Sequence, residues 1–314
     1  MKFLKKYSFL IGLVIFPLII AKLDFLKLVD ILSKIDYLYL ILALLLSFPL
    51  LIIKGYRWNY LKKKQKIYYK LKESILMYGV GSYLGIITPG RLGDLSKIIY
   101  LKKDHYSSGK SSVSVILDRL FDLFFLLIVG YLGMFFFASF FQKTIFSLTL
   151  IILSIILLLI IISKSNLLRL FFKKIFLLII PLNYQKSWKL NFQDFINDLK
   201  IYQLKDYSFI LFITLFYWFI YYSQIFFLAR SLNIVTIPFL YLIISVTMAG
   251  LITLLPISIS GIGTREATLI LLFSFFQISP EATISFSMLI LSMSILMALI
   301  GLVCWFKKPL KFSN

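Results

Sequence analysis

Long apolar runs, repeated along the whole chain, constrain this sequence more than any other feature. Of its 314 residues, 61% are hydrophobic and only 15% are charged. An ordinary soluble domain has about 25% charged residues, so that class is excluded. A β-barrel would need alternating segments of about ten residues, which are not visible here. The sequence therefore predicts an all-α polytopic membrane protein.

Six of the apolar runs are predicted to cross the membrane completely. They cover residues 7–21, 37–53, 113–141, 144–163, 207–229 and 283–306. Lysines and arginines gather at residues 1–6, 54–72, 97–110, 164–206 and 307–311. Basic loops are typical of the cytoplasmic side of a membrane. We therefore expect a multi-pass protein of the cell membrane with its N- and C-termini in the cytoplasm.

Two other apolar segments are broken by proline and glycine beside charged residues. The first, 74–100, contains Pro89, Gly90, Arg91, Gly93 and Asp94, and the second, 236–276, contains Pro256, Gly261, Gly263, Arg265 and Glu266. Proline removes a backbone donor and glycine lets the chain turn. Backbone groups freed in this way need protein or water around them inside a bilayer. Each segment is therefore predicted to be a re-entrant hairpin, the first entering from the cytoplasm and the second from outside.

Entry from opposite sides predicts an inverted-topology repeat. Its halves would be residues 1–163 and 207–314, joined by the basic interfacial segment 164–206 within one membrane domain, 1–314. In the alternative, 236–256 and 263–276 both cross the membrane, which gives eight spans and the same orientation. Gly81 and Gly85 have the spacing of a small-residue face for close helix packing. Thr264 or Ser260 is expected to cap the helix that follows the second break.

Ionised side chains beside the two breaks form the candidate substrate-binding site. They are Arg91, Asp94, Asp118, Arg119, Arg265 and Glu266. Charge inside a bilayer is costly unless it is paired or hydrated, and the planar fork of arginine suits phosphate oxygens. We expect the arginines to bind a phosphate and the carboxylates to balance them or to bind a lipid amine. An equal alternative is structural, with the pairs Arg91–Asp94 and Arg265–Glu266 locking the hairpins together.

The net charge of +21 does not require a nucleic-acid partner. The positive-inside rule explains where the basic residues lie, and they also suit lipids with anionic headgroups. With one cysteine, Cys304, and one histidine, His105, the sequence predicts no disulfide, no metal site and no cofactor. It also contains no Gly-x-x-x-x-Gly-Lys-Ser/Thr phosphate loop.

Three motifs in this order resemble the flippase-like family typified by the membrane-embedded half of lysylphosphatidylglycerol synthase. They are Pro89-x-Arg91-x-Gly93-Asp94, then Asp118-Arg119, then Pro256 followed by Gly261-x-Gly263-x-Arg265-Glu266. Members of the family carry glutamate at the position of Asp94, and glycine is common at the position of Ser260. The resemblance implies movement of aminoacylated phospholipids or polyprenyl-linked glycolipids between leaflets.

Enzyme activity is not expected, because the soluble aminoacyl-transferase domain of the full synthase is not found before Asn314. Two other functions stay open. One is a membrane-embedded lipid-modifying enzyme that uses intramembrane carboxylates for acid–base chemistry. The other is a non-transporting partner in a lipid or glycolipid pathway, which would dock an enzyme through residues 54–72 or 164–206. Assembly with a second copy of the chain or with a lipid-pathway enzyme is compatible with each of these functions.

Overall fold

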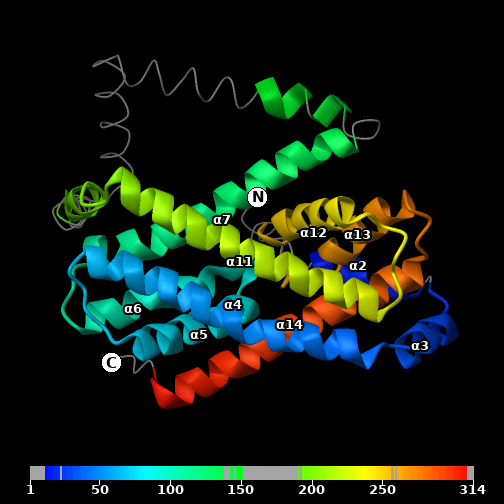
Figure 1. Cartoon of the computed structure of the whole chain (residues 1–314), viewed down its shortest axis with the longest axis horizontal. Helices are drawn as coiled ribbons and strands as arrows, with labels where there is room; N and C mark the ends of the chain where they lie inside the picture. The colour runs from blue at the N-terminus through cyan, green and yellow to red at the C-terminus, as the bar shows by residue number, and fades with distance from the viewer. Residues whose placement is uncertain are drawn as a thin grey trace.

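The chain folds into a bundle whose long helices lie roughly along the longest axis of the molecule (Figure 1). The structure is a computed structural model, and it describes residues 11–21, 23–137, 142–144, 146–150, 190, 193–255, 258 and 260–309. The helices among these residues include α2 (Ile11–Ile20), α3 (Phe25–Ser33), α4 (Tyr37–Lys64), α5 (Leu71–Ile87), the 3₁₀ helix η2 (Pro89–Leu95), α6 (Ser96–Lys103), α7 (Ser108–Phe136), α11 (Leu204–Ser231), α12 (Phe239–Thr253), α13 (Thr264–Ser274) and α14 (Pro280–Lys307). The regular elements described are all helical, as the sequence predicts.

Three helices in the described part of the chain are long and apolar enough to cross a membrane: α4, α11 and α14. Each has 28 residues, which at ~1.5 Å per residue exceeds the ~30 Å hydrocarbon core of a bilayer. The predicted span 7–21 is described only from Ile11, and residues 151–189 lie outside the described part. The count of six spans, the interfacial segment 164–206 and the halves 1–163 and 207–314 therefore stay predictions.

Two segments that were expected to be loops are helical. The first is α3, which lies in the connection between the predicted spans 7–21 and 37–53 and is capped by the Asp24 carboxylate on the backbone N–H of Leu26 (3.0 Å). The second is the final part of α4, which continues to Lys64 instead of ending near Ile53. Lys54 and Arg57 therefore lie inside a helix. The sequence analysis placed the end of the span before these two cations. It could not show that carboxylates of α7 neutralise their charges.

The first hairpin consists of α5, η2 and α6, and Thr88 organises its turn. The Thr88 hydroxyl donates to the carbonyl of Leu84 (2.8 Å) and accepts from the N–H of Gly93 (2.7 Å). Gly93 in turn packs directly on the backbone of α5, because a Cβ atom built there would lie 2.1 Å from the carbonyl carbon and oxygen of Leu84. The bonds of Thr88 satisfy backbone groups that the helix break sets free, which is the requirement inside a bilayer.

Small residues on α5 face the returning limb of the same hairpin and also α14. A Cβ atom on Gly85 would lie 2.9 Å from the Asp94 carboxylate, and one on Gly81 would lie 3.2 Å from the Lys97 side chain. The predicted close-packing face at these two glycines therefore packs inside the hairpin. On another side of α5, a Cβ atom on Gly301 would lie 2.3 Å from the carbonyl oxygen of Gly79, which brings α14 against α5.

The second hairpin consists of α12, a turn and α13. Pro256 lies outside the described residues, but Ser260, Gly261 and Gly263 all have positive φ angles (53°, 79° and 84°), a region where glycine is strongly favoured. The N-cap of α13 is Gly263, whose N–H donates to the Glu266 carboxylate (2.6 Å). The predicted cap by Thr264 or Ser260 is therefore wrong. The Glu266 side chain in the first turn caps the helix instead, and its negative charge interacts favourably with the positive end of the helix dipole.

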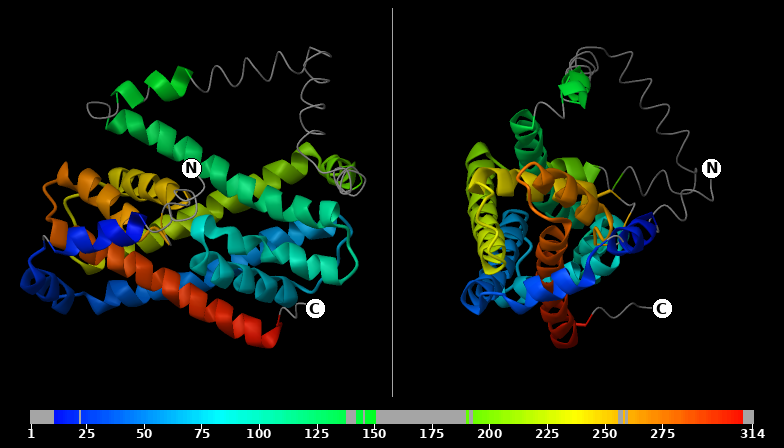
Figure 2. Two further views of the ribbon diagram at one scale, coloured as in Figure 1. Left: turned by 180° about the vertical axis from the view of Figure 1, so that it is seen from behind. Right: turned by 90° about the vertical axis from the view of Figure 1, so that its right-hand side faces the viewer.

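The two hairpins approach each other from opposite ends of the bundle. Figures 1 and 2 show α5 and α6 at one end of the long axis, and α12 and α13 at the other. The hydroxyl of Ser260 in the second hairpin donates to the carbonyl of Ile86, at the end of α5 (2.7 Å). The two breaks predicted from the sequence therefore meet in the middle of the protein. Their entry into a membrane as re-entrant hairpins stays a prediction.

Replacing Gly93 with alanine should destabilise the first hairpin strongly, because the new methyl group would overlap the Leu84 carbonyl. Overpacking of this kind costs about 3 kcal/mol or more. Gly250→Ala is the matched control, since a Cβ atom there has no neighbour within 4 Å. Thermal unfolding of the purified proteins in detergent measures both changes. Equal unfolding midpoints for the two variants would contradict the packing described here.

Candidate functional site

A cavity of about 600 Å³ lies where the two hairpins meet. Its wall is built from α4, α5, η2, α7, α11, α12, α13 and α14. The charged residues that line it are Lys54, Arg91, Asp94, Arg119, Asp122 and Arg265. Pockets that bind small ligands typically have volumes of about 300–1,000 Å³. The cavity therefore has the size of a ligand site and an unusually ionic wall for a bundle of apolar helices.

Asp94 is tied to α7 by an ion pair with Arg119. The sequence predicted an Arg91–Asp94 pair, and the structure corrects that prediction. Asp94 is only 7% exposed, and its carboxylate fits against the Cα of Gly85, where no side chain is in the way. Arg119 also donates to the backbone carbonyl of Arg91 (3.4 Å). The turn of the first hairpin is thereby held on α7.

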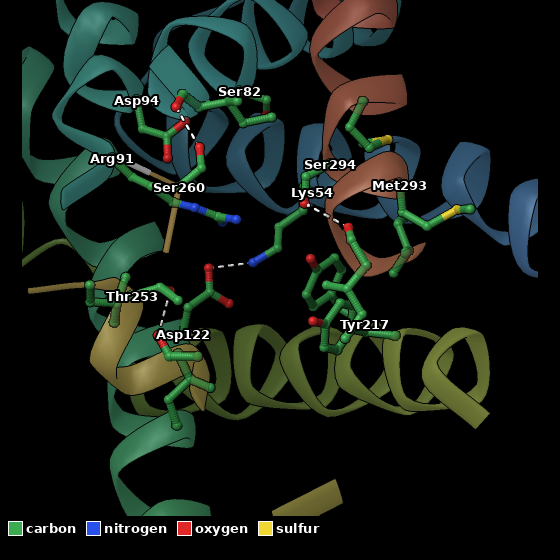
Figure 3. Close-up of a pocket in the computed structure, with 18 of the residues that line it drawn as sticks. Lys54, Ser82, Arg91, Asp94, Asp122, Tyr217, Thr253, Ser260, Met293 and Ser294 are labelled. Carbon is green, nitrogen blue, oxygen red and sulfur yellow. Dashed lines mark hydrogen bonds and ion pairs between the residues drawn. The ribbon is translucent and has the colours of Figure 1, made fainter. Parts of the chain in front are cut away.

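Arg91 differs from the other arginines of the site because its own side chain is unpaired. The residue is exposed and lines the cavity, and Figure 3 shows its guanidinium group directed into the cavity toward Lys54. No hydrogen bond or ion pair joins this side chain to a residue that the structure describes. Its φ angle is 56°. Strained backbone of this kind in a non-glycine residue is concentrated at functional sites.

Arg265 and Glu266 form the ion pair that the sequence predicted, at 2.7 Å between Nη2 and Oε1. Ser287 of α14 joins them, accepting from Arg265 Nε (2.7 Å) and donating to Glu266 (2.6 Å). Glu266 also accepts from the N–H of Gly263. Both side chains are buried. This set of bonds fixes the start of α13 on α14, and leaves Arg265 at the cavity wall.

A buried arginine on α4 connects that helix to α7 and α11. Arg57 is fully buried and donates to both carboxylates of α7, Asp118 (Nε–Oδ1 2.8 Å) and Asp122 (Nη1–Oδ1 2.9 Å). It also donates to the hydroxyl of Thr214 on α11 (2.8 Å) and to the backbone carbonyl of Asp118 (2.8 Å). Each of its three nitrogens therefore has a partner. This matches the rule that a buried charge must be both paired and hydrogen-bonded.

Two lysines complete what we call the α4–α7 charge network, which consists of Lys54, Arg57, Lys97, Asp118 and Asp122. Lys97 Nζ lies 3.1 Å from Asp118 Oδ2, and Lys54 pairs with Asp122. Figure 3 shows this Lys54–Asp122 pair at the cavity. Asp118, in contrast, is fully buried and does not line the cavity, although Arg119 beside it does. Neighbouring residues point about 100° apart around a helix, which separates their roles.

The sequence singled out six charged residues, and the structure brings five of them to the cavity or into direct contact with its wall. Asp118 lies deeper, as an anchor of the α4–α7 charge network. Contact of any of the six with a substrate stays a prediction. The residues missed are Lys54, Arg57 and Lys97, which were interpreted as cytoplasmic topology signals. The four-residue spacing of Asp118 and Asp122 already predicts that they share a helix face, and the three-residue spacing of Lys54 and Arg57 is the matching signal on α4 that was overlooked.

Asp118→Asn should lower the free energy of unfolding by about 3–5 kcal/mol, because removing one partner leaves buried Arg57 without its full charge balance. Asp30→Asn is the matched control, since Asp30 pairs with Lys34 at the surface with a side chain 58% exposed. Exposed pairs contribute at most about 1 kcal/mol. Unfolding in detergent, followed by circular dichroism, compares the two. Similar losses in both variants would remove the anchoring role from Asp118.

Comparison with known protein families matches residues 7–301 to the family described as "Lysylphosphatidylglycerol synthase TM region". The match covers both hairpins and every residue that lines the cavity. A comparison with curated proteins finds no match. Together with the three long apolar helices, the family match indicates a membrane protein related to lipid modification or lipid movement. The chain belongs to the family of lysylphosphatidylglycerol synthase transmembrane regions.

Proposed function

We propose that this protein moves a membrane lipid between the two leaflets of the cell membrane, with the lipid headgroup passing through the cavity between the hairpins. The observation that carries the proposal is the unpaired guanidinium group of Arg91 inside that cavity. The candidate lipids are an aminoacylated phospholipid or a polyprenyl-linked glycolipid. The proposal includes cytoplasmic N- and C-termini, in line with the basic residues at both ends of the chain.

The cavity wall is suited to a molecule that is charged at one end and apolar at the other. Arg91 supplies a cation for a phosphate group, and arginine binds phosphate oxygens through two parallel hydrogen bonds. Apolar side chains such as Leu50, Ile225 and Met293 line the same cavity. A headgroup therefore finds polar partners in the interior of the bundle while its hydrocarbon part stays in contact with apolar surface. This arrangement lowers the cost of carrying a charge across hydrocarbon.

The contacts of the carboxylates favour transport over acid–base catalysis. Asp94, Asp122 and Glu266 each form an ion pair with a cation. A general acid or base must be able to exchange a proton with the reacting group, and carboxylates held in this way are poorly placed to do so. They act better as anchors that keep the surrounding cations in position.

The two hairpins are held by separate ion pairs, so a rearrangement at one of these anchors leaves the other intact. The first is held on α7 through Asp94 and Arg119, and the second on α14 through Arg265 and Ser287. The hydrogen bond from Ser260 to Ile86 joins the two hairpins directly. Rearrangement at this junction would open the cavity alternately to each side. Such rocking of one repeat against another is common in secondary transporters.

Arg91→Gln should reduce the rate of lipid movement in proteoliposomes by about tenfold or more, because a charge-assisted bond to the headgroup is lost. The readout is the protection of a fluorescent lipid from a quencher added outside. Arg230→Gln is the matched control, since Arg230 lies over the Phe226 ring and outside the cavity lining. An Arg91 variant that is folded and fully active would reject the role of this residue. Glu266→Ala is less informative, because Glu266 also caps α13.

Gly250→Trp should block the cavity without disturbing the fold. Gly250 lines the cavity on α12, and a Cβ atom built there would have no neighbour within 4 Å. An indole ring there would occupy volume that a headgroup needs, so lipid movement should fall to the rate of empty liposomes. Gly250→Ala should keep most of the wild-type rate. Unchanged transport by a stable tryptophan variant would show that the lipid takes another route.

A further inference from the structure

Each carboxylate around the cavity is already paired with a cation of the protein. Asp94 is paired with Arg119, Asp122 with Lys54 and Arg57, and Glu266 with Arg265. An ammonium group entering the cavity would have to displace one of these cations from its partner. It would also meet the unpaired guanidinium of Arg91, which repels it. Displacing a buried partner leaves an uncompensated charge and is strongly unfavourable.

The charges in and behind the wall have a positive excess. The cations are Lys54, Arg57, Arg91, Lys97, Arg119 and Arg265, and the carboxylates bonded to them are Asp94, Asp118, Asp122 and Glu266. Six basic side chains thus stand against four carboxylates, so basic groups outnumber carboxylates among the residues described. Unbalanced charge in the bilayer interior is costly, so the cavity is built to receive an anion.

The excess is located at two identifiable places in the wall. One positive charge belongs to Arg91. The other belongs to the α4–α7 charge network, where three cations share two carboxylates and Lys54 reaches the cavity. Figure 3 shows Arg91 and Lys54 directed into the same space.

Neutral donors extend this anion-binding surface. Tyr217 and Tyr221 of α11 line the cavity, and neither hydroxyl forms a hydrogen bond with a residue that the structure describes. The Tyr217 ring also supports Lys54, whose Nζ lies 3.9 Å from the ring centroid. Hydroxyl donors beside two cations are suited to several oxygens of one phosphate group, because charge-assisted hydrogen bonds of this kind are the strong ones.

We infer that the headgroup carried by this protein has two negative charges and no cationic group, as in a phosphate monoester or a diphosphate ester of a lipid. The inference rests on the proposed passage of a headgroup through this cavity. It excludes a lysyl-type headgroup from the preferred substrates, although the name of the matched family refers to such a lipid. Arg91 and Lys54 bind the two negative charges, while the buried ion pairs hold the wall around them.

Competition binding tests the inference separately from transport. Purified protein is offered equal amounts of phosphatidic acid, phosphatidylglycerol and lysyl-phosphatidylglycerol with identical acyl chains, and the retained lipids are measured by native mass spectrometry. The buffer is held at about pH 7, above the second pKa of a phosphate monoester at about 6. We expect phosphatidic acid to be retained about tenfold over phosphatidylglycerol, the effect of an additional charge-assisted hydrogen bond. Lysyl-phosphatidylglycerol should be retained least.

Variants and a second lipid pair locate the effect and identify the source of the phosphate. Arg91→Gln should bring retention of phosphatidic acid down to that of phosphatidylglycerol, and Lys54→Gln should also reduce it. Arg230→Gln should change nothing. A parallel arm with geranylgeranyl diphosphate against geranylgeraniol distinguishes prenyl diphosphates from glycerolipids. Stronger retention of phosphatidic acid or of the prenyl diphosphate identifies the lipid tail that the protein prefers. Equal retention of both shows that the phosphate alone is recognised.

Equal retention of the three glycerolipids, or preference for the lysyl lipid, would overturn the inference while leaving lipid transport possible. Selectivity that survives in both the Arg91 and the Lys54 variants would also overturn it. Selective binding of the dianionic lipids without any movement in proteoliposomes would support recognition of a dianionic headgroup by the cavity and reject the proposed transport. Thermal unfolding of each variant separates a lost binding group from a lost fold.

Discussion

Two broken helices can share the interior of this bundle only because the groups set free at each break find partners within the protein. Thr88 closes the first break by bonding both Leu84 and Gly93. Glu266 caps the second, and Ser260 spans the gap to Ile86. Without water to satisfy them, these backbone groups would cost several kcal/mol each in hydrocarbon. These partners lie within the turns and at the junction between them, so the space beside the junction stays open as the cavity.

Ion pairs separate the charged residues that hold the fold together from the one whose side chain is unpaired among the residues described. Asp94–Arg119, Arg265–Glu266 and the α4–α7 charge network fix the hairpins and the long helices relative to one another. Their geometry uses nearly all of the available carboxylate oxygens. Arg91 has no ion pair with the residues described, and its side chain lies in the cavity from a turn with a positive φ angle. Structural locking thus belongs to the paired residues, and Arg91 is left as the proposed contact for a substrate.

Several features could be predicted from the sequence because they depend on local chemistry. The breaks near Gly93 and Gly263 follow from proline and glycine in apolar runs, and Arg265–Glu266 is a pair of neighbours. The partner of Asp94 could not be predicted, because a 3₁₀ turn with Arg91 at positive φ directs its side chain away from Asp94 and toward the cavity. Arg57 was missed for a different reason. A cluster of basic residues after an apolar run, such as 54–72, is typical of a cytoplasmic boundary, and the tertiary structure shows that the α7 carboxylates lie opposite Arg57.

The contact between α5 and α14 has a practical consequence. Cys304, the only cysteine in the sequence, is buried with its sulfur close to Gly79, where even a methyl group on the glycine would lie within 2.8 Å of Sγ. Separation of the first hairpin from the last helix would expose that sulfur to a thiol-reactive label. The rate of Cys304 alkylation, measured with and without added lipid, therefore reports how often α5 and α14 separate.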